Sequence, residues 1–282
     1  MATVRKSRLT NGMGKYFSLI VLIILLIIVI FPLIIVSLNA FKTEAEVNTN
    51  GPMSLPQSLN LDTVKYVWTT TNYPRLLMNS TIIAVSAALI AVGISLLNAF
   101  ALGIGKFKGR TLALLFFMLA MTLPNEALVY PLYYFFKLIH LYDNLLSVIL
   151  TAAALQASFG TYLLTSVFSA FDREVLEAAM IDGCNKFTLL VRIVAPLSMP
   201  TVAVLIVFFF IGEWNDFFLP LIMLISSKNY TVPVAMALAR SERNVVITLQ
   251  SAAALLGILP CILFFIAFQR TLTKGVTAGA IK

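Results

Sequence analysis

Residues 171–200 read FDREVLEAAMIDGCNKFTLLVRIVAPLSMP and lie between two long apolar stretches. Seven of these thirty residues are charged, in a chain of which 11% of the residues are charged. Asp172 can cap the start of a helix, and Glu174 lies in the first turn, where the helix dipole favours negative charge. We predict a helix over residues 173–181 that ends near Gly183, a residue suited to the left-handed turn that stops a helix.

A second helix is predicted to begin at Asn185 and to end at Pro196. The two helices together form a helix–turn–helix along the inner surface of a membrane. Ala178 and Ala179 leave the first helix with little side-chain bulk, so that a partner could approach its backbone closely; the alternative is an ordinary solvated surface helix. Helical spacing puts Phe187, Leu190, Val191 and Val194 on the apolar face of the second helix, and Asn185, Thr188 and Arg192 on its polar face.

The remainder of the chain has the composition of a membrane protein. Of its 282 residues 60% are hydrophobic, and its mean hydropathy is +0.95, whereas a soluble domain is about 45–50% apolar. A run of roughly 20 apolar residues spans the hydrocarbon core of a bilayer. We predict an all-α membrane protein with six transmembrane helices, over residues 17–38, 77–104, 111–138, 144–167, 197–225 and 250–269.

The basic residues predict the orientation of these spans. Thirteen lysines and arginines fall on one side of the membrane and six on the other, with Lys137 at the end of a span. Because basic residues favour the cytoplasmic side, both termini and the 168–196 loop are predicted to be cytoplasmic. The net charge of +8 is spread over short loops, which argues against a nucleic-acid partner. The first apolar run is too long for the core of a signal peptide, so we expect it to be retained.

These boundaries divide the chain into three parts. Residues 1–76 are expected to hold an N-terminal tail, the first transmembrane helix and an outer loop. Residues 77–269 form the transmembrane core with the cytoplasmic loop 168–196, and residues 270–282 form a cytoplasmic tail. The outer loops 39–76 and 226–249 are long enough to meet a partner outside the cell, or are ordinary connectors. The 28-residue third span would be about 42 Å long as a straight helix, so it must tilt, bend or protrude, and Pro124 and Pro131 favour a bend.

The segment EAAMIDGCNKFTLLVRIVAP resembles the EAA signature of permease subunits of ABC importers. The signature runs E-A-A, three residues, G, about nine residues and then I-x-x-P. In that family the loop is a coupling helix that seats in a cleft of the ATPase subunit, and the family has the fold of a type I ABC importer permease. The resemblance implies that the ATPase is contacted by Glu177, Ala178, Ala179, Asp182, Gly183, Lys186 and Phe187.

Further segments resemble carbohydrate-uptake permeases of the maltose type, above all the smaller permease of the pair. They include FKTEAEV (41–47), TLPNEALVYPLYYFFKLIHLYDN (122–144), EWNDFFLPLIML (213–224) and the ending QRTLTKGVTAGAIK (269–282). The resemblance implies a subunit of the bacterial plasma (inner) membrane that imports a sugar or oligosaccharide by alternating access. Its implied partners are a homologous permease, two ABC ATPase subunits, an extracytoplasmic solute-binding protein and the lipid bilayer.

The chain shows no motor and no catalytic centre of its own. No segment matches the G-x-x-x-x-G-K-[S/T] pattern of a phosphate-binding loop. The chain has one histidine, His140, and two cysteines, Cys184 and Cys261, distant in sequence, so we expect neither a catalytic set nor a metal site, and no disulfide framework. No cofactor is expected on this chain, and ATP and Mg would be bound by the ATPase partners.

Polar side chains at membrane depth mark a candidate substrate pathway. Such groups are costly in hydrocarbon and normally face a bundle interior or water. Amides and carboxylates beside aromatic rings suit a sugar, which has apolar C–H faces and a rim of hydroxyl groups; the alternative is hydrogen bonding between helices or subunits. The candidates are Asn125, Glu126, Tyr130, Gln156, Glu213, Trp214, Asn215 and Asp216, with Tyr133 as a further aromatic residue.

Three other functions compete with an ABC sugar permease. An ion-coupled secondary carrier would use the embedded acids as proton or sodium sites, and it usually shows inverted repeats or paired broken helices. An intramembrane enzyme would need the catalytic set that we do not find. ABC permeases for amino acids, peptides or phosphate also carry EAA loops.

Overall fold

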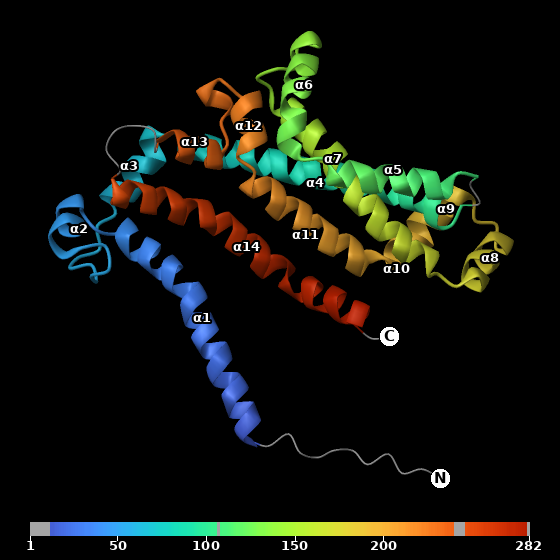
Figure 1. Cartoon of the computed structure of the whole chain (residues 1–282), viewed down its shortest axis with the longest axis horizontal. Helices are drawn as coiled ribbons and strands as arrows, with labels where there is room; N and C mark the ends of the chain where they lie inside the picture. The colour runs from blue at the N-terminus through green and yellow to red at the C-terminus, as the bar shows by residue number, and fades with distance from the viewer. Residues whose placement is uncertain (1–11, 106–107, 240–245, 281–282) are drawn as a thin grey trace. The chain divides into compact units, whose positions relative to one another are not determined.

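The computed structural model describes residues 12–105, 108–239 and 246–280, and within these ranges the only regular elements are helices. Figure 1 labels them. The long helices are α1 (Gly12–Ala40), α4 (Tyr73–Gly103), α5 (Arg110–Thr122), α6 (Asn125–Leu138), α7 (Leu145–Ser169), α11 (Met199–Asn215) and α14 (Ile247–Ala280). The short ones are α2 (Glu44–Asn50), α3 (Asp62–Thr70), α8 (Arg173–Ile181), α9 (Lys186–Leu189), the π-helical turn η1 (Leu190–Val194), α10 (Ala195–Leu197), α12 (Phe218–Met223), the 3₁₀ turn η2 (Ser227–Asn229) and α13 (Val232–Ala239).

The chain forms two compact units, and the first holds residues 1–70 and 243–256. Within it, α1 contains the most apolar of the candidate membrane spans found in the described residues, and none of that window is buried. The loop after α1 is fastened by Lys42, which is fully buried and whose Nζ donates to the carbonyl oxygens of Gly51 and Pro52 and to Ser54 Oγ. These oxygen partners satisfy a buried ammonium group that would otherwise be costly.

The second unit, residues 71–242 and 257–282, is built on α4, α7 and α11, which lie side by side (Figure 1). Small residues let α4 and α7 approach closely, as is common in membrane bundles. A Cβ added to Gly160 of α7 would lie 2.2 Å from Ser95 Oγ of α4. Ser95 Oγ in turn reaches the carbonyl oxygens of Ala91 and Ala157.

Two apolar clusters occupy opposite ends of this second unit. One cluster joins α8, α9 and η1 to the nearer halves of α4, α7 and α11, with Leu164, Leu176, Val194 and Leu205 among its buried members. The other joins α6 and α12 to the far ends of α4 and α7. Since α4 and α7 contribute to both clusters, they connect the two ends.

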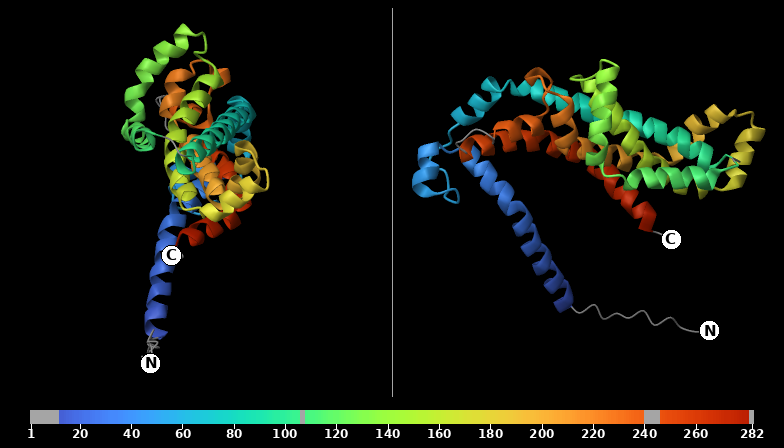
Figure 2. Two further views of the ribbon diagram at one scale, coloured as in Figure 1. Left: turned by 90° about the vertical axis from the view of Figure 1, so that its right-hand side faces the viewer. Right: turned by 45° about the horizontal axis from the view of Figure 1, so that its top comes forward.

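One predicted span is sharply bent, and a second sharp bend lies where another predicted span begins. The third predicted span breaks at Leu123–Pro124, where α5 and α6 meet at 96° (Figure 2). Pro124 caps α6, whereas Pro131 lies inside that helix. The expectation of a bend is therefore confirmed at Pro124, whereas α6 continues through Pro131. The segment 186–197 and α11 also form a bent pair, at 79°.

The prediction of six spans meets a more complex structure. Among the described residues four helices are long and apolar enough to cross a membrane, and six spans result if each bent pair counts as one. The predicted span 197–225 is not one helix, because α11 ends at Asn215 and α12 is a separate short helix. Asp216 has extended backbone angles and accepts the N–H of Phe218 at Oδ1, which ends α11 there. The last helix, α14, continues through residues 270–280.

Candidate functional site

The loop after α7 contains the predicted short helix. α8 covers Arg173–Ile181, as predicted, and Asp172 is its N-cap residue, although its side chain makes no capping hydrogen bond. Gly183 has φ +87°, and its N–H donates to the carbonyl of Met180, while that of Cys184 reaches Ala179. The turn therefore requires a residue that tolerates the left-handed region, and no atom lies within 4 Å of a Cβ built at Gly183.

One face of α8 is anchored on the unit to which it belongs. Leu176 and Ala179 are buried in the apolar cluster that includes α4, α7 and α11. Ala179 is therefore not available to a partner, and the expectation that both alanines open the helix is wrong for this one. The other face leaves Glu177, Ala178 and Ile181 exposed, and Ile181 is 86% exposed.

The second helix of the loop differs from its prediction on the apolar side. It begins as expected, with Asn185 Oδ1 accepting the N–H of Thr188 at 2.8 Å. Leu190 and Val194 are buried as predicted, but Phe187 and Val191 are exposed. The helix passes into the π-helical turn η1, and the extra residue in that turn shifts the face that later side chains present. Pro196 does not end the helix, because α10 runs from Ala195 to Leu197.

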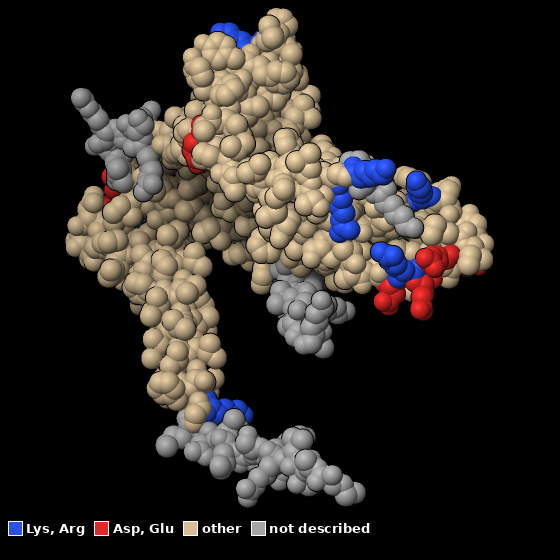
Figure 3. Space-filling view, turned by 45° about the vertical axis from the view of Figure 1, so that its right-hand side comes forward, with Lys and Arg blue, Asp and Glu red and all other residues tan. Residues whose placement is uncertain are grey.

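Charged side chains gather at this end of the second unit (Figure 3). Four of the exposed charged residues of the loop are acidic and three are basic, so that neither sign dominates its surface. A surface of mixed charge beside exposed apolar residues is typical of the rim of a protein interface. The exposed charged residues of the loop are Asp172, Arg173, Glu174, Glu177, Asp182, Lys186 and Arg192.

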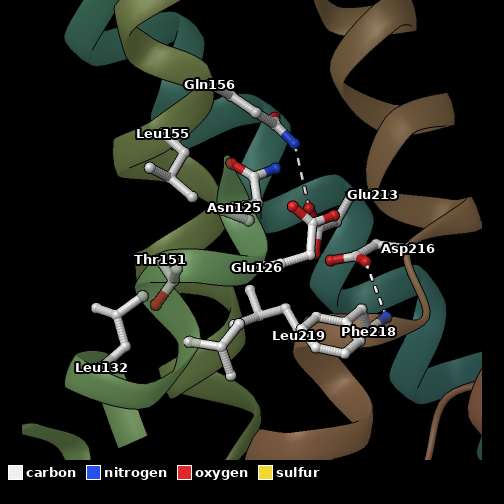
Figure 4. Close-up of a pocket in the computed structure, with 12 residues that line it drawn as sticks. Asn125, Glu126, Leu132, Thr151, Leu155, Gln156, Glu213, Asp216, Phe218 and Leu219 are labelled. Carbon is white, nitrogen blue, oxygen red and sulfur yellow. Dashed lines mark hydrogen bonds between the residues drawn. The ribbon is translucent and has the colours of Figure 1, made fainter. Parts of the chain in front are cut away.

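A second candidate site is a cavity of about 100 Å³ between α6, α7, α11 and α12. It lies at the two helix breaks, because α6 begins there and α11 ends there. Figure 4 shows its polar side chains directed toward a common space. The lining residues are Asn125, Glu126, Val129, Leu132, Thr151, Ala152, Leu155, Gln156, Glu213, Asp216, Phe218 and Leu219.

Gln156 and Glu213 connect two walls of this cavity. The Nε2 atom of Gln156 donates to Oε2 of Glu213 at 3.1 Å. Glu213 is only 7% exposed, and its other oxygen, Oε1, has no hydrogen-bond partner among the described residues. The same holds for Oε1 of Gln156 and for the hydroxyl of Thr151, which is 5% exposed. Buried polar atoms are normally paired, and these three are exceptions whose surface is almost wholly covered by the chain itself.

An apolar groove adjoins the polar cavity. It has a volume of about 270 Å³, and it shares Leu132, Thr151 and Leu155 with the cavity. Its other lining residues are Leu128, Pro131, Phe135 and Ala154. Polar and apolar walls therefore meet along α7.

Five of the eight predicted pathway residues line the cavity, namely Asn125, Glu126, Gln156, Glu213 and Asp216. The other three lie elsewhere. Trp214 stacks on Phe210, and its Nε1 donates to the carbonyl of Gly257 at 3.3 Å. Asn215 bonds back to the carbonyl of Ile211, and the exposed Tyr130 lies against Tyr134. The aromatic ring at the cavity is that of Phe218, which we did not predict.

Sequence reasoning also missed Asp143, in the loop between α6 and α7. Its carboxylate accepts hydrogen bonds from the N–H groups of Ile225 and Ser226, from the Ser226 hydroxyl and from Asn229. Partial burial raises the pKa of Asp143, but the donors from Ser226, Asn229 and Ile225 outweigh it, and the pKa is lowered overall. The adjacent Asp and Asn in LYDN, between two apolar runs, were the available signal of a turn.

The loop that Asp143 holds is fastened on its other side by α4. The side-chain amide of Asn79 donates to the carbonyl oxygens of Lys228 and Tyr230. The N–H of Val232 donates to Ser80 Oγ at 2.9 Å. The segment 224–232 is therefore clamped from two helix ends.

The described residues contain no group of three or more His, Cys, Asp or Glu side chains that could hold a metal ion.

The chain is similar to known permeases over nearly its whole length. It is 29% identical over 284 residues to the inner membrane ABC transporter permease protein YcjP of Escherichia coli (strain K12), covering 100% of both chains. It is 31% identical to the probable starch degradation products transport system permease protein AmyC of Thermoanaerobacterium thermosulfurigenes, covering 95% of this chain and 97% of the other. It is 28% identical to the arabinooligosaccharides transport system permease protein AraQ of Halalkalibacterium halodurans, covering 90% and 91%.

The fold is also that of a chain in a solved ABC transporter. A chain in the crystal structure of a bacterial ABC transporter involved in the import of the acidic polysaccharide alginate matches with a TM-score of 0.81 and 18% identity, covering 96% of this chain and 99% of that one. A family model described as the binding-protein-dependent transport system inner membrane component matches residues 91–278. Because this match covers more than half of the chain, the protein belongs to that family and is a permease subunit of an ABC importer.

Proposed function

We propose that this chain is one of two permease subunits through which an ATP-driven importer moves a sugar or oligosaccharide into the cell. The carbohydrate substrate is supported by relatives named for starch degradation products, arabinooligosaccharides and diacetylchitobiose. The importer comprises a homologous permease, two ATPase subunits that bind ATP and Mg, and an extracytoplasmic solute-binding protein. The chain lies in the bacterial inner membrane with both termini in the cytoplasm.

The observation that carries the proposal is that α8 is buried on one face and exposed on the other. Leu176 and Ala179 fix the helix to the apolar cluster of its own unit, while Glu177, Ala178 and Ile181 are exposed to a partner. A helix that transmits force must be seated rigidly on one side and must contact the motor on the other. The proposed contact residues are Glu177, Ala178, Asp182, Gly183, Lys186 and Phe187, with Ala179 acting from the anchored face.

Alternating access would use the two bent pairs. ATP-driven closure of the ATPase dimer would pull α8 and, through the shared apolar cluster, the nearer halves of α4, α7 and α11. The α6–α12 end has a separate apolar cluster, so it could move as a second rigid part. The break of the first pair, at the start of α6, lies at the cavity, whereas the break of the second pair lies between Leu197 and Met199, at the start of α11.

The substrate would pass along the wall that contains the cavity. A volume of about 100 Å³ holds a few water molecules, whereas sites for small organic ligands are about 300–1,000 Å³. The pathway is therefore completed by the partner permease. Asn125, Glu126, Gln156, Glu213 and Asp216 provide the groups on this side of it.

A photo-crosslinking amino acid at Ile181 tests the proposed motor contact. Leu138 is the matched control, because it is similarly exposed (79% against 86%) but lies at the end of α6 in the other apolar region. In membranes of the native host, crosslinking from residue 181 should yield an adduct with an ABC ATPase, and crosslinking from residue 138 should not. An ATPase adduct from neither position, or equally from both, would contradict the proposed contact.

A further inference from the structure

The segment between α2 and α3 exposes large apolar side chains. Residues 47–61 contain no charged side chain. Within them, Met53, Leu55 and Leu59 are 73%, 75% and 80% exposed. Single apolar residues are common on protein surfaces, whereas several together mark a contact surface. All three lie in one short loop, residues 51–61, so they are candidates for such a surface.

Hydrogen bonds hold both ends of this loop beside the end of α1. At its start, the Nζ atom of the fully buried Lys42 donates to the carbonyl oxygens of Gly51 and Pro52. At its end, the N–H of Asn60 donates to the carbonyl oxygen of Phe41 at 2.9 Å. Phe41 and Lys42 directly follow the last residue of α1. The exposed apolar side chains are therefore held next to the point where α1 ends.

The length of α1 places the loop at the edge of the membrane. The candidate span Gly14–Ala40 has 27 residues, so at 1.5 Å per residue it is about 40 Å long. A bilayer is about 40–45 Å thick with its polar layers, and its hydrocarbon core takes about 30 Å of this. When α1 spans the bilayer, its end and the loop bonded to it therefore lie in the polar layer. Apolar side chains at this level reach the acyl chains, as those of interfacial segments do.

The two sides of the structure after α1 differ in polarity. α2 exposes polar side chains, among them Glu44 and Asn48, whereas the loop exposes methionine and leucine. The carboxylate of Glu46 accepts the N–H of Gln57 at 2.6 Å, which fixes the helix to the loop. Figure 1 shows α2 and the loop beside the end of α1. The polar side suits water, and the loop suits an apolar surface.

Lipid fits this loop better than a protein partner does. The rim of a protein interface carries polar and charged groups, and the loop has no charged residue. Its apolar surface instead continues that of α1, of whose most apolar window none is buried.

We propose that the loop of residues 51–61 dips into the outer leaflet of the membrane beside α1, with Met53, Leu55 and Leu59 among the acyl chains. Lys42 is the positioning residue, because its hydrogen bonds hold the start of the loop at the end of α1. The inference goes beyond the proposed function and uses one part of it, namely that α1 crosses the membrane with Ala40 on the outer side.

A photo-crosslinking amino acid identifies what covers the loop. It is placed in turn at Leu55, at Leu59 and at Asn48, an exposed residue of α2, in membranes of the native host that contain the complete importer. Mass spectrometry of the isolated chain should find a phospholipid adduct at residues 55 and 59 and none at residue 48. Leu22 and Ile24, which are exposed on opposite faces of α1, report separately whether that helix lies in lipid.

Lys42→Met tests the positioning role. It keeps an apolar stem but removes the hydrogen bonds of Nζ, so the lipid adducts at residues 55 and 59 should fall severalfold while those from α1 persist. Lys65→Met, at an exposed lysine of α3, is the matched control and should leave all the yields unchanged. Unchanged yields in Lys42→Met would overturn the role given to Lys42.

The remaining outcomes separate the inference from the proposed function. Lipid adducts from α1, with none at residues 55 and 59, would overturn the inference and leave the proposed function intact. A crosslink from residues 55 and 59 to the partner permease or to the solute-binding protein would likewise overturn it and identify a protein interface. Lipid adducts from neither α1 nor the loop would contradict both the inference and a membrane-spanning α1.

Discussion

The amide of Gln156 on α7 donates to the buried carboxylate of Glu213 on α11 at a distance of 3.1 Å. This bond joins the two helices beside the cavity, next to the point where α11 ends. It also satisfies one oxygen of a side chain that is only 7% exposed. The bond is therefore both a structural connection and a part of the proposed pathway.

Replacing Gln156 by leucine should destabilise the protein. Both carboxylate oxygens of Glu213 would then be buried without a donor, at a cost of about 1–3 kcal/mol. Glu213→Gln keeps the shape and the acceptor oxygen, so its cost should be smaller. Thermal unfolding in detergent measures the difference, and equal unfolding temperatures for Gln156→Leu and the original protein would contradict it.

Replacing Gly160 by alanine should loosen the packing of α4 on α7. The added Cβ would lie 2.2 Å from Ser95 Oγ and 2.9 Å from Ser95 Cβ, so the helices would have to move apart. Overpacking of this kind costs about 1–3 kcal/mol. Gly93→Ala is the matched control, because nothing lies within 4 Å of a Cβ at that position of α4. The unfolding temperature should fall for the first variant only, and an equal fall in both would be evidence against this packing.

Replacing Gly183 by aspartate should weaken the proposed contact with the ATPase and so reduce sugar uptake. Gly183 has φ +87° and directly follows Asp182, so aspartate adds both strain and a second negative charge to the turn. Asparagine has nearly the same shape, tolerates the left-handed region and adds no charge. Sugar uptake should fall about tenfold or more in Gly183→Asp, because the ATPase no longer binds at the turn, and much less in Gly183→Asn. Normal sugar uptake in both variants would show that the proposed mechanism does not depend on this turn.

Replacing Asp143 by alanine should release the segment 224–232. Its carboxylate accepts four hydrogen bonds from Ile225, Ser226 and Asn229, and their loss should speed amide hydrogen exchange in that segment. Exchange in α8, which Asp143 does not contact, is the internal control. Unchanged exchange in residues 224–232 would show that the clamp does not hold them.

The hydrogen bonds to Asp143 also predict how the stability of this loop depends on pH. The pKa of Asp143 lies below its ordinary value of 3.8 because of these donors. The carboxylate therefore binds fewer protons in the folded protein, and its stabilising contribution is fully present above pH 3.8 and is lost as the pH falls through the lowered pKa. Residues 224–232 should be better protected from amide hydrogen exchange in the original protein than in Asp143→Ala. The size of this difference should be constant from neutral pH down to about pH 5. A loss of that difference between pH 7 and pH 5 would contradict the assignment.

Local sequence signals predicted short helices better than long ones. Glu174, Gly183 and Asn185 act within a few residues, and α8 and the start of α9 appear where these residues put them. Val191 lies in the turn Leu190–Val194, which is π-helical, whereas hydrophobic spacing alone assumes an α-helix. The exposure of Phe187, which precedes that turn, is not explained by it. Apolar length likewise predicted one span over 197–225, but the break at Asp216 depends on a side chain bonding to the backbone of Phe218.

The candidate site was predictable in part for the same reason. Gln156 and Glu213 could be identified because polar side chains are rare within membrane-spanning segments. The sequence could not distinguish residues that face the cavity from Trp214. Trp214 lies among the same polar residues in the sequence, but its side chain bonds to Gly257. Asp143 was missed because its partners, at Ile225–Asn229, are more than eighty residues away in the sequence.

The most direct test of the account is the purification of the tagged chain from its native host in mild detergent, with Gly183→Asp processed in parallel. Mass spectrometry should recover a Walker-type ATPase and a second permease with the original chain, and it should recover the permease without the ATPase from the variant. If the sample is crosslinked before extraction and still contains no ATPase, the central claim of an ATP-driven importer coupled through α8 is contradicted. An ion-driven carrier would then be the better account.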